Sequence, residues 1–173
     1  MSESTAKPLD REIVVHVAET CLCLHTQRAA RALARLFDRA LRPFGLSNGQ
    51  FSLLMALNRP EPPSIGALAP FLAMDRTSLT AALKPLERRG LVRVAADRSD
   101  RRSRLIAITA NGVALLEAAL PTWRETHAQL DAAMSAGVPD RLRADLRQVP
   151  PVAATLSASG DGQDGPSSSG QST

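Results

Sequence analysis

The sequence predicts a mainly α-helical protein with one small β-hairpin, an α+β class in which helices dominate. Hydrophobic residues make up 44% of the 173 residues and aromatic residues only 3%, so Leu, Ala and Val must form the core. Small aliphatic side chains favour closely packed helices. One stretch departs from this pattern, because Leu91–Val94 and Leu105–Ile108 are apolar or alternating segments on either side of a charged loop. The length suits a single domain with a tail.

The N-terminal part is predicted to be a polar arm followed by one long helix. Residues 1–10 are mostly polar and are expected to form a flexible arm. Residues 11–42 are rich in Ala, Leu and Arg, with apolar residues near one stripe, as in an amphipathic helix. Pro43 and Gly45 are expected to end this helix, because proline cannot continue it and glycine tolerates the turn that follows.

A second helix is predicted to begin after Ser47. Ser47 and Gln50 have the spacing of a capping box, in which each side chain bonds the backbone N–H of the other residue. The apolar run that follows carries the helix to about Leu57. Residues 58–63 contain three prolines and are expected to form a loop.

Two shorter helices are predicted next, and each has a capping residue. Ser64 can cap a helix that runs to Leu72, and Asp75 can cap a helix that runs to Arg89. Pro85 lies inside the second of these, where a proline removes one backbone hydrogen bond. We therefore expect a kink there, with regular helix only up to Lys84.

The end of this helix and a β-hairpin are predicted next. Arg88-Arg89-Gly90 places cations at the negative end of a helix and a glycine where the chain must turn left-handed. The strands on either side of residues 97–104 make this charged segment the tip of a hairpin. A helix beside an arginine-rich hairpin can place one element in each groove of DNA.

The C-terminal part is predicted to contain two helices and a tail. Thr109 can cap a long helix over residues 110–135, with a kink at Pro121. A last helix is expected over residues 139–156. Residues 157–173 consist mainly of Ser, Gly, Asp, Gln and Pro, and should be disordered because they cannot bury enough apolar surface.

Charge and composition favour a polyanion as the partner. The formal net charge is +4 and the isoelectric point about 10.0. Residues 64–112 contain nine Arg and Lys against four Asp and Glu, a net +5 that exceeds the charge of the whole chain. This concentration points to nucleic acid, although many basic proteins bind none.

Other classes of protein are disfavoured. The chain has three histidines, no glycine-rich phosphate loop and no defensible nucleophile–base arrangement, so we expect neither an enzyme nor a bound cofactor. Without an apolar run of the roughly 20 residues that a bilayer requires, or a signal-peptide core, no membrane association is expected and the protein should be cytoplasmic.

Together these segments resemble the MarR family of winged helix-turn-helix transcription regulators. The resemblance covers about residues 21–130 and rests on FGLSNGQFSLLMAL, MDRTSLTAALKPLERRGLVRV and DRSDRRSRLIAITANG. It implies a winged helix over residues 47–108 that binds double-stranded DNA. It also implies a homodimer on a pseudo-palindromic operator, held together by the helices at 11–42, 110–135 and 139–156.

The resemblance and the residue chemistry suggest a set of DNA contacts. Hydroxyls and an arginine at the start of the 75–89 helix suit base edges and phosphates, with Lys84 one turn further on. Arg102 matches the wing-tip arginine that enters the minor groove, and Asp100 the acid that orients it, while Arg98, Arg101 and Arg104 suit phosphates. The alternative is an ordinary solvated face. The candidate DNA-binding residues are Ser64, Arg76, Thr77, Ser78, Thr80, Lys84, Arg98, Asp100, Arg101 and Arg102.

Cys21 and Cys23 suggest a second possible function. On one helix they would face opposite ways and could not bond each other, and Cys21 with His25 would make a poor metal site, so no metal is expected. Cys23 falls where organic-hydroperoxide sensors of the resembled family carry their reactive thiol. Those sensors hold the thiolate with tyrosines, which this chain lacks. The simpler alternative is that both cysteines are small packing residues.

The favoured function is a repressor that a small aromatic or phenolic ligand releases from DNA. In the resembled family such ligands bind between the dimerisation helices and the winged domain. Candidate pocket residues are His25, Arg28, Trp123 and His127, which are equally explained as interface residues. The alternatives are a thiol-based redox sensor of the same fold that uses Cys23, and a winged helix that binds protein rather than DNA.

Overall fold

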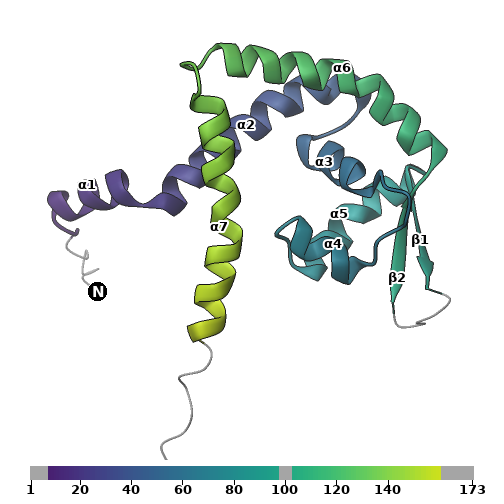
Figure 1. Ribbon diagram of the computed structural model, residues 1–173, viewed down its shortest axis with the longest axis horizontal. Coiled ribbons are helices and arrows are strands. Elements are labelled where there is room, and N and C mark those ends of the chain that lie inside the picture. Colours follow the sequence, from purple (N-terminus) through teal and green to yellow (C-terminus); the bar gives the residue numbers. More distant parts are fainter. Residues whose placement is uncertain (1–7, 98–102, 161–173) are drawn as a thin grey trace, which may run out of the picture.

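The computed structural model describes residues 8–97 and 103–160 and consists of a compact head carried on long helices (Figure 1). The mainly α-helical class with a single two-stranded hairpin is confirmed. In chain order the elements are α1 Arg11–Thr20, α2 Leu22–Leu41, the 3-10 turn η1 Arg42–Phe44, α3 Asn48–Leu57, α4 Ile65–Phe71, α5 Arg76–Arg88, β1 Val92–Ala96, β2 Arg104–Ile108, α6 Ala110–Ala132 and α7 Val138–Gly160.

The head has one apolar core, to which every element from α3 to β2 contributes. The apolar faces of α3 and α5 supply most of its fully buried side chains, with Leu68 from α4 and Ile106 from β2. The end of α2 and the first half of α6 close this core through Leu41 and Leu116. The members that are almost completely buried are Phe51, Leu41, Leu54, Leu57, Leu68, Leu79, Leu86 and Ile106.

The hairpin is also joined to the start of α4. Strands β1 and β2 are antiparallel, with Val92 opposite Ile108. On its other side β2 pairs with the loop before α4, where the Ile106 N–H donates to the Pro63 carbonyl at 2.9 Å and Ser64 bridges Leu105. This pairing fixes the N-terminus of α4 beside the hairpin.

The turn from α5 into β1 is locked to the first turn of α6. Gly90 has a positive φ of 67°, and its carbonyl accepts from the Thr109 hydroxyl at 2.7 Å. The Thr109 N–H donates to the Leu91 carbonyl at 3.0 Å. The backbones approach so closely that a Cβ on Gly112 would lie 2.3 Å from the Leu91 oxygen. Only glycine fits at position 112.

A second tie joins the end of α5 to the turn between α2 and α3. The Arg89 Nη1 donates to the Gly45 carbonyl at 2.7 Å, over 44 residues of sequence. Gly45 itself has a φ of 63°, in the left-handed region that glycine enters without strain. The arginine and the glycine of the Arg89-Gly90-Leu91 segment therefore each make a specific long-range contact.

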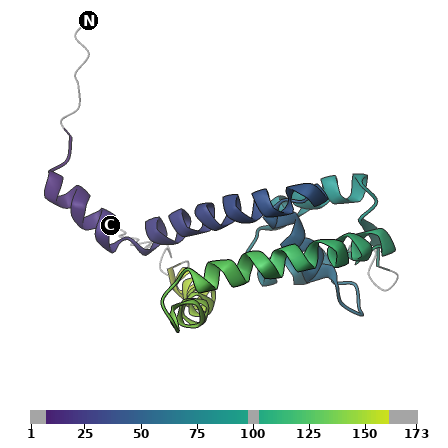
Figure 2. The same cartoon turned by 90° about the horizontal axis from the view of Figure 1, so that it is seen from above.

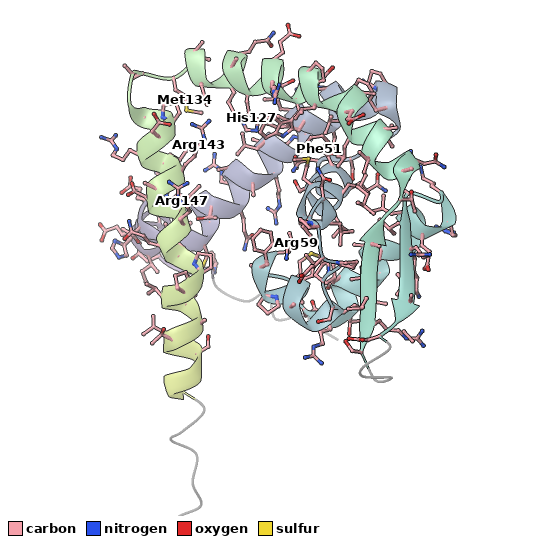
Figure 3. All side chains as sticks on the ribbon, turned by 45° about the vertical axis from the view of Figure 1, so that its right-hand side comes forward. Phe51, Arg59, His127, Met134, Arg143 and Arg147 are labelled. Atoms are coloured by element: carbon pink, nitrogen blue, oxygen red, sulfur yellow. The ribbon has the colours of Figure 1, made fainter. Side chains whose placement is uncertain are left out.

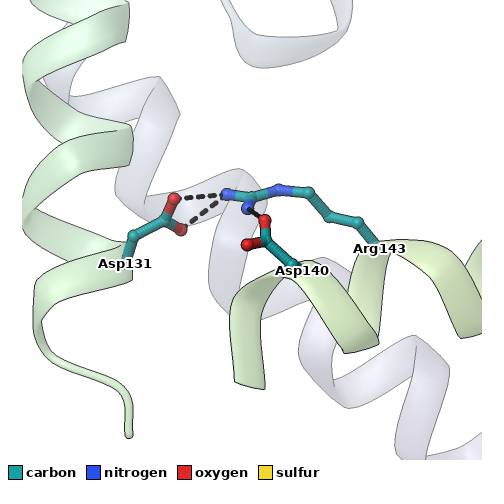
Figure 4. Close-up of polar contacts among 3 residues, drawn as sticks. All are labelled: Asp131, Asp140 and Arg143. Atoms are coloured by element: carbon teal, nitrogen blue, oxygen red, sulfur yellow. Dashed lines mark hydrogen bonds and ion pairs between the residues drawn. The ribbon is translucent and has the colours of Figure 1, made fainter. Parts of the chain in front are cut away.

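Outside the head, α2 and α6 lie side by side (Figure 2), and α7 leaves the end of α6 as a separate arm. The Arg143 guanidinium holds the junction of α6 and α7 (Figure 4): its Nη2 lies 2.6 Å from both carboxylate oxygens of Asp131, and its Nη1 lies 3.2 Å from Asp140. None of the helices within residues 8–97 and 103–160 is both long and apolar enough to cross a lipid bilayer.

All four predicted helix caps are confirmed. Ser47 and Gln50 form the complete capping box. The side chains of Ser64, Asp75 and Thr109 each accept from a backbone N–H three residues on. These caps were predictable because each uses a short polar side chain next to the first helical turn.

The predicted single helix over residues 11–42 is wrong, because the chain breaks at Cys21. Cys21 has extended backbone angles and caps α2, its Sγ accepting from the Leu24 N–H at 3.4 Å. The His25 Nε2 lies 3.1 Å from the Glu19 carbonyl at the end of α1. No residue of α1 is buried in the protomer, so no packing keeps it in line with α2. Apolar periodicity does not reveal such local side-chain contacts.

Both helices continue through their internal prolines. Helix α5 runs through Pro85 to Arg88, so the prediction of regular helix only up to Lys84 is wrong, whereas α6 runs through Pro121 as predicted. The kinks expected at the two prolines stay predictions. In both cases the residue four positions earlier, Ala81 or Glu117, is exposed, so water can bond the carbonyl that loses its partner. A solvent-facing carbonyl makes the lost hydrogen bond less costly than in a buried helix.

The last helix is longer than predicted. Helix α7 passes through Pro150 and Pro151 and ends at Gly160, so the first four residues of the predicted tail are helical. The remainder of that tail, residues 161–173, lies outside the described residues, as do residues 1–7 of the predicted arm.

We predict that Gly112→Ala strongly destabilises the fold. The added methyl group would overlap the Leu91 carbonyl and the Ile108 side chain, so the α6 backbone would have to move. Urea denaturation should show that the free energy of unfolding falls by at least about 2 kcal/mol.

Gly49→Ala is the matched control. Gly49 also lies in the first turn of a helix, but outside its chain neighbours and its own helix backbone no atom lies within 4 Å of the position that a Cβ would take there. Its unfolding free energy should stay constant or rise by up to about 1 kcal/mol. Equal effects of the two substitutions would contradict the proposed close approach at Gly112.

Candidate nucleic-acid interface

A polar cleft lies where α4, α5 and the hairpin meet. Its volume is about 520 Å³. Residues from the start of α4, the first turns of α5 and the start of β2 line it, namely Ser64, Ile65, Gly66, Arg76, Thr80, Ser103 and Arg104. The cap of Ser64 and the pairing of its loop with β2 fix the α4 side of this cleft.

The amphipathic pattern of α5 aims its polar face outward. Leu79, Leu83 and Leu86 are buried in the head, which leaves the opposite face of the helix in solvent. A shallow groove runs along that face next to the cleft, lined by Arg76, Thr77, Thr80, Ala81 and Lys84. A protruding helix with this surface suits the major groove of DNA, which is about 12 Å wide.

Two hydroxyls on α5 bond within the helix. The Ser78 Oγ donates to the Asp75 carboxylate at 2.6 Å, and the Ser78 N–H donates to the same carboxylate at 2.8 Å. The Ser78 hydroxyl and N–H together hold the pKa of Asp75 below its usual value, so this cap stays ionised. The Thr80 Oγ1 donates to the Arg76 carbonyl at 2.7 Å.

The structure brings together most of the predicted DNA-binding residues that it describes. Ser64, Arg76 and Thr80 share the cleft, and Thr77 and Lys84 lie along the adjoining groove. Ser78 lines neither surface. Four wing residues predicted from sequence lie outside the described residues, namely Arg98, Asp100, Arg101 and Arg102.

Sequence reasoning missed Gly66 and Ser103 as cleft residues. A glycine in the first turn of a short helix gives no signal by itself, since its importance depends on the side chain that lies over it. Ser103 reaches the cleft because β2 pairs with the loop before α4. Both positions depend on contacts between segments that are distant in sequence.

Two of the four predicted ligand-pocket residues lie together in an aromatic cluster. The Trp123 and His127 ring centroids are 4.3 Å apart, and His127 lies 4.5 Å from the Phe37 ring. Trp123 stacks on Phe51 at 5.8 Å. Figure 3 labels His127 on α6 and Phe51 on α3, and this cluster joins those helices to α2.

His25 and Arg28 are not part of that cluster within one protomer. Both lie early on α2, nine or more residues before Phe37. At 1.5 Å per residue this separates them from the cluster by about 14 Å or more along the helix axis. Arg28 is exposed, and the His25 ring contacts the end of α1.

The cysteines are placed differently from the sequence interpretation. Cys21 lies at the break between α1 and α2 rather than inside a helix, so the argument that both thiols share one helix does not hold. Cys21 is half-buried and Cys23 is exposed. No group of three or more His, Cys, Asp or Glu side chains within residues 8–97 and 103–160 is placed to hold a metal ion.

Comparisons with known proteins agree with this geometry. The model of the MarR family matches residues 46–103, from the turn before α3 to the residue before β2. The transcriptional regulator MosR of M. tuberculosis, in a crystal structure with DNA, is 39% identical with a TM-score of 0.71, and the match covers 79% of this chain and 98% of that one. The chain belongs to the MarR family.

Two further proteins are also similar to this chain. The transcriptional activatory protein BadR of Rhodopseudomonas palustris is 39% identical over 88 residues, which are 49% of this chain and 50% of BadR. The chain therefore matches about half the length of that relative. CouR from Rhodococcus jostii RHA1, in a crystal structure with p-coumaroyl-CoA, is 25% identical with a TM-score of 0.65, covering 76% of this chain and 93% of CouR.

We predict that His127 makes folding stability fall as the pH drops. Burial among the aromatic rings and the nearby charge of Arg143 lower the pKa of His127 below 6.5, outweighing the opposite effect of Asp131. Near pH 6.5 the unfolded chain then binds a proton at this histidine and the folded protein does not. The free energy of unfolding therefore falls as the pH drops below that value. The loss stays under the roughly 1.4 kcal/mol per pH unit that one proton can contribute.

Urea denaturation between pH 7.5 and 5.5 at fixed protein concentration measures this effect. His127→Gln should flatten the dependence, whereas His16→Gln, on the exposed helix α1, should keep it. Identical pH profiles for wild type and His127→Gln would rule out His127 as the responsible group.

Proposed function

We propose that the protein is a homodimeric, sequence-specific DNA-binding transcriptional regulator. In this proposal α5 enters the major groove and the β1–β2 hairpin lies over the adjacent minor groove. The observation that carries the proposal is the polar cleft between α4, α5 and β2, whose rim holds the cations Arg76 and Arg104. Lys84 extends the positive surface along α5. The DNA-bound crystal structure of MosR supports the same use of the fold.

Phosphate contacts would supply much of the affinity. No ion pair within the described residues joins Lys84 or Arg104 to a carboxylate, so these cations are available to phosphates. Neutralising phosphates releases counterions, which makes binding fall steeply as salt rises. The minor-groove role of Arg102 stays a prediction from sequence.

Dimerisation is supported by apolar surface that the protomer leaves in solvent. Helix α1 exposes Ile13, Val14 and Val17. Helix α7 exposes large aliphatic residues with helical spacing, namely Leu142, Leu146, Val149, Val152 and Leu156. Extended apolar helix faces of this kind are typical of a surface that a second copy covers.

Regulation by a small molecule is the second part of the proposal. The crystal structure of CouR with p-coumaroyl-CoA supports an aromatic or phenolic ligand. Such a ligand releases the repressor by favouring a dimer geometry whose α5 helices no longer match the groove spacing. BadR is named an activatory protein, so whether this chain represses or activates transcription is a separate part of the proposal. The protein acts in the cytoplasm and catalyses no reaction.

We predict that Lys84→Ala weakens DNA binding mainly through the phosphates. Fluorescence anisotropy with the upstream intergenic duplex should give a shallower plot of log affinity against log salt. The slope should change by about 0.9 for each lost contact, with one contact in each protomer. Arg124→Ala, which removes the same charge from the exposed side of α6, should leave the slope unchanged.

Salt-insensitive or absent DNA binding by the wild-type protein would contradict the proposal. That result would favour a winged helix that binds another protein, since such a surface needs no phosphate contacts.

We predict that Leu146→Asp dissociates the dimer and abolishes tight DNA binding. A carboxylate on the apolar stripe of α7 would lose its water on dimerisation, which is costly without a partner charge. Light scattering after size exclusion reports the mass. Gln148→Asp places the same charge about 200° around the helix and should keep the dimer. A dimeric Leu146→Asp variant would exclude this face from the interface.

A further inference from the structure

We propose that Arg76 is the residue that reads a guanine in the operator and that Gly66 positions it. This inference rests on the proposed DNA-binding function and adds which base is read and by what means. Gly66, in the first turn of α4, would act only through Arg76, as a positioning residue.

The hydrogen bonds of α5 occupy two of its hydroxyls but leave the Arg76 guanidinium free of partners among the described residues. The hydroxyls of Ser78 and Thr80 donate to groups of α5 itself or of its cap, at 2.6 and 2.7 Å. Reading a base through these donors would first require breaking those bonds. The Arg76 guanidinium makes no hydrogen bond or ion pair with any described residue, so all of its donors are available.

Arg76 is also placed where it does not help the fold. It is the first residue of α5, at the positive end of the helix dipole, where a cation is unfavourable. The neighbouring carboxylate of Asp75 is taken by the N–H and hydroxyl of Ser78. A side chain that costs stability and has no partner in the described part of the protein is typical of a functional position.

The Arg76 guanidinium lies against the first turn of α4. An ideal Cβ built on Gly66 would lie 3.4 Å from the Arg76 Nη2 and 3.9 Å from its Cζ, with the Ser64 Oγ at 3.7 Å. The guanidinium therefore lies over the first turn of α4, where a Cβ would only touch it, whereas the γ carbons of a branched residue at position 66 would displace it. Arg76 lines both the cleft and the groove along α5, so it is held on the proposed DNA side.

The chemistry of the guanidinium points to guanine. A guanidinium presents two parallel donors, which match the O6 and N7 acceptors on the major-groove edge of guanine. Lys84 is a flexible point charge and suits a phosphate better than a base edge.

The test uses the wild-type dimer and the best duplex selected from a randomised library. Each guanine of a half-site is replaced in turn by 7-deazaguanine, which lacks the N7 acceptor. Anisotropy should show one position where this change weakens wild-type binding by roughly 10-fold. Arg76→Ala should bind that site and its 7-deazaguanine variant equally, with little change in salt slope, and Arg76→Lys should restore little of the difference.

Gly66→Val tests the positioning role and Gly49→Val is its control. Both glycines are the second residue of their helix, but only Gly66 has the Arg76 side chain within 4 Å of the position that a Cβ would take. Gly66→Val should lose the discrimination against 7-deazaguanine while keeping the melting temperature of the Gly49→Val variant. The Gly49→Val variant should discriminate as the wild type does.

Two results separate this inference from the proposed function. Absence of DNA binding by the wild-type dimer would overturn both. This inference alone would be overturned if the wild type binds tightly and Arg76→Ala still discriminates against 7-deazaguanine. It would also be overturned if Arg76→Ala binds every sequence more weakly to the same extent and shows a shallower salt slope. A uniform loss of affinity in Arg76→Ala would make Arg76 a phosphate contact.

Discussion

The close contact between the first turn of α6 and the turn that leaves α5 determines how the rest of the molecule is arranged. Here Thr109 bonds the carbonyls of Gly90 and Leu91, and Gly112 lies against the Leu91 carbonyl with no room for a side chain. The contact ends the hairpin, starts the long helix and fixes the direction of α6 relative to α5. Backbone carbonyls and a buried glycine cannot adapt as side chains do, so this joint is rigid.

Rigidity at that joint connects the two parts of the molecule. Helix α6 leaves the head there and runs along α2, where the rings of Phe37, Trp123 and His127 pack together. Its far end holds α7 through the ion pair of Asp131 with Arg143. A change in how α7 or α6 packs against a second protomer would therefore move the whole head. This is the mechanical requirement for a ligand that acts at the dimerisation helices to alter DNA binding.

On the head, the packing of α5 determines which side chains can meet DNA. Three leucines on one face fix the rotation of the helix, so its polar face must point outward. Hydrogen bonds within the helix then divide that face. Ser78 and Thr80 stabilise local structure, whereas Arg76 and Lys84 keep their donors for another molecule. Polar residues on the exposed face thus differ in whether they can bind DNA. The difference depends on whether their donors already bond to groups within the protein.

The sequence by itself determined the order of elements, the four caps and the wing hairpin. Ser47, Ser64, Asp75 and Thr109 act within three residues of themselves, and apolar periodicity is likewise a local property. Tertiary structure alone decided the continuation of α5 through Pro85 and the contact of Arg76 with Gly66. Each of these depends on which face is exposed or on what a distant segment places nearby. A one-dimensional pattern contains neither kind of information, because both arise only when the chain packs on itself.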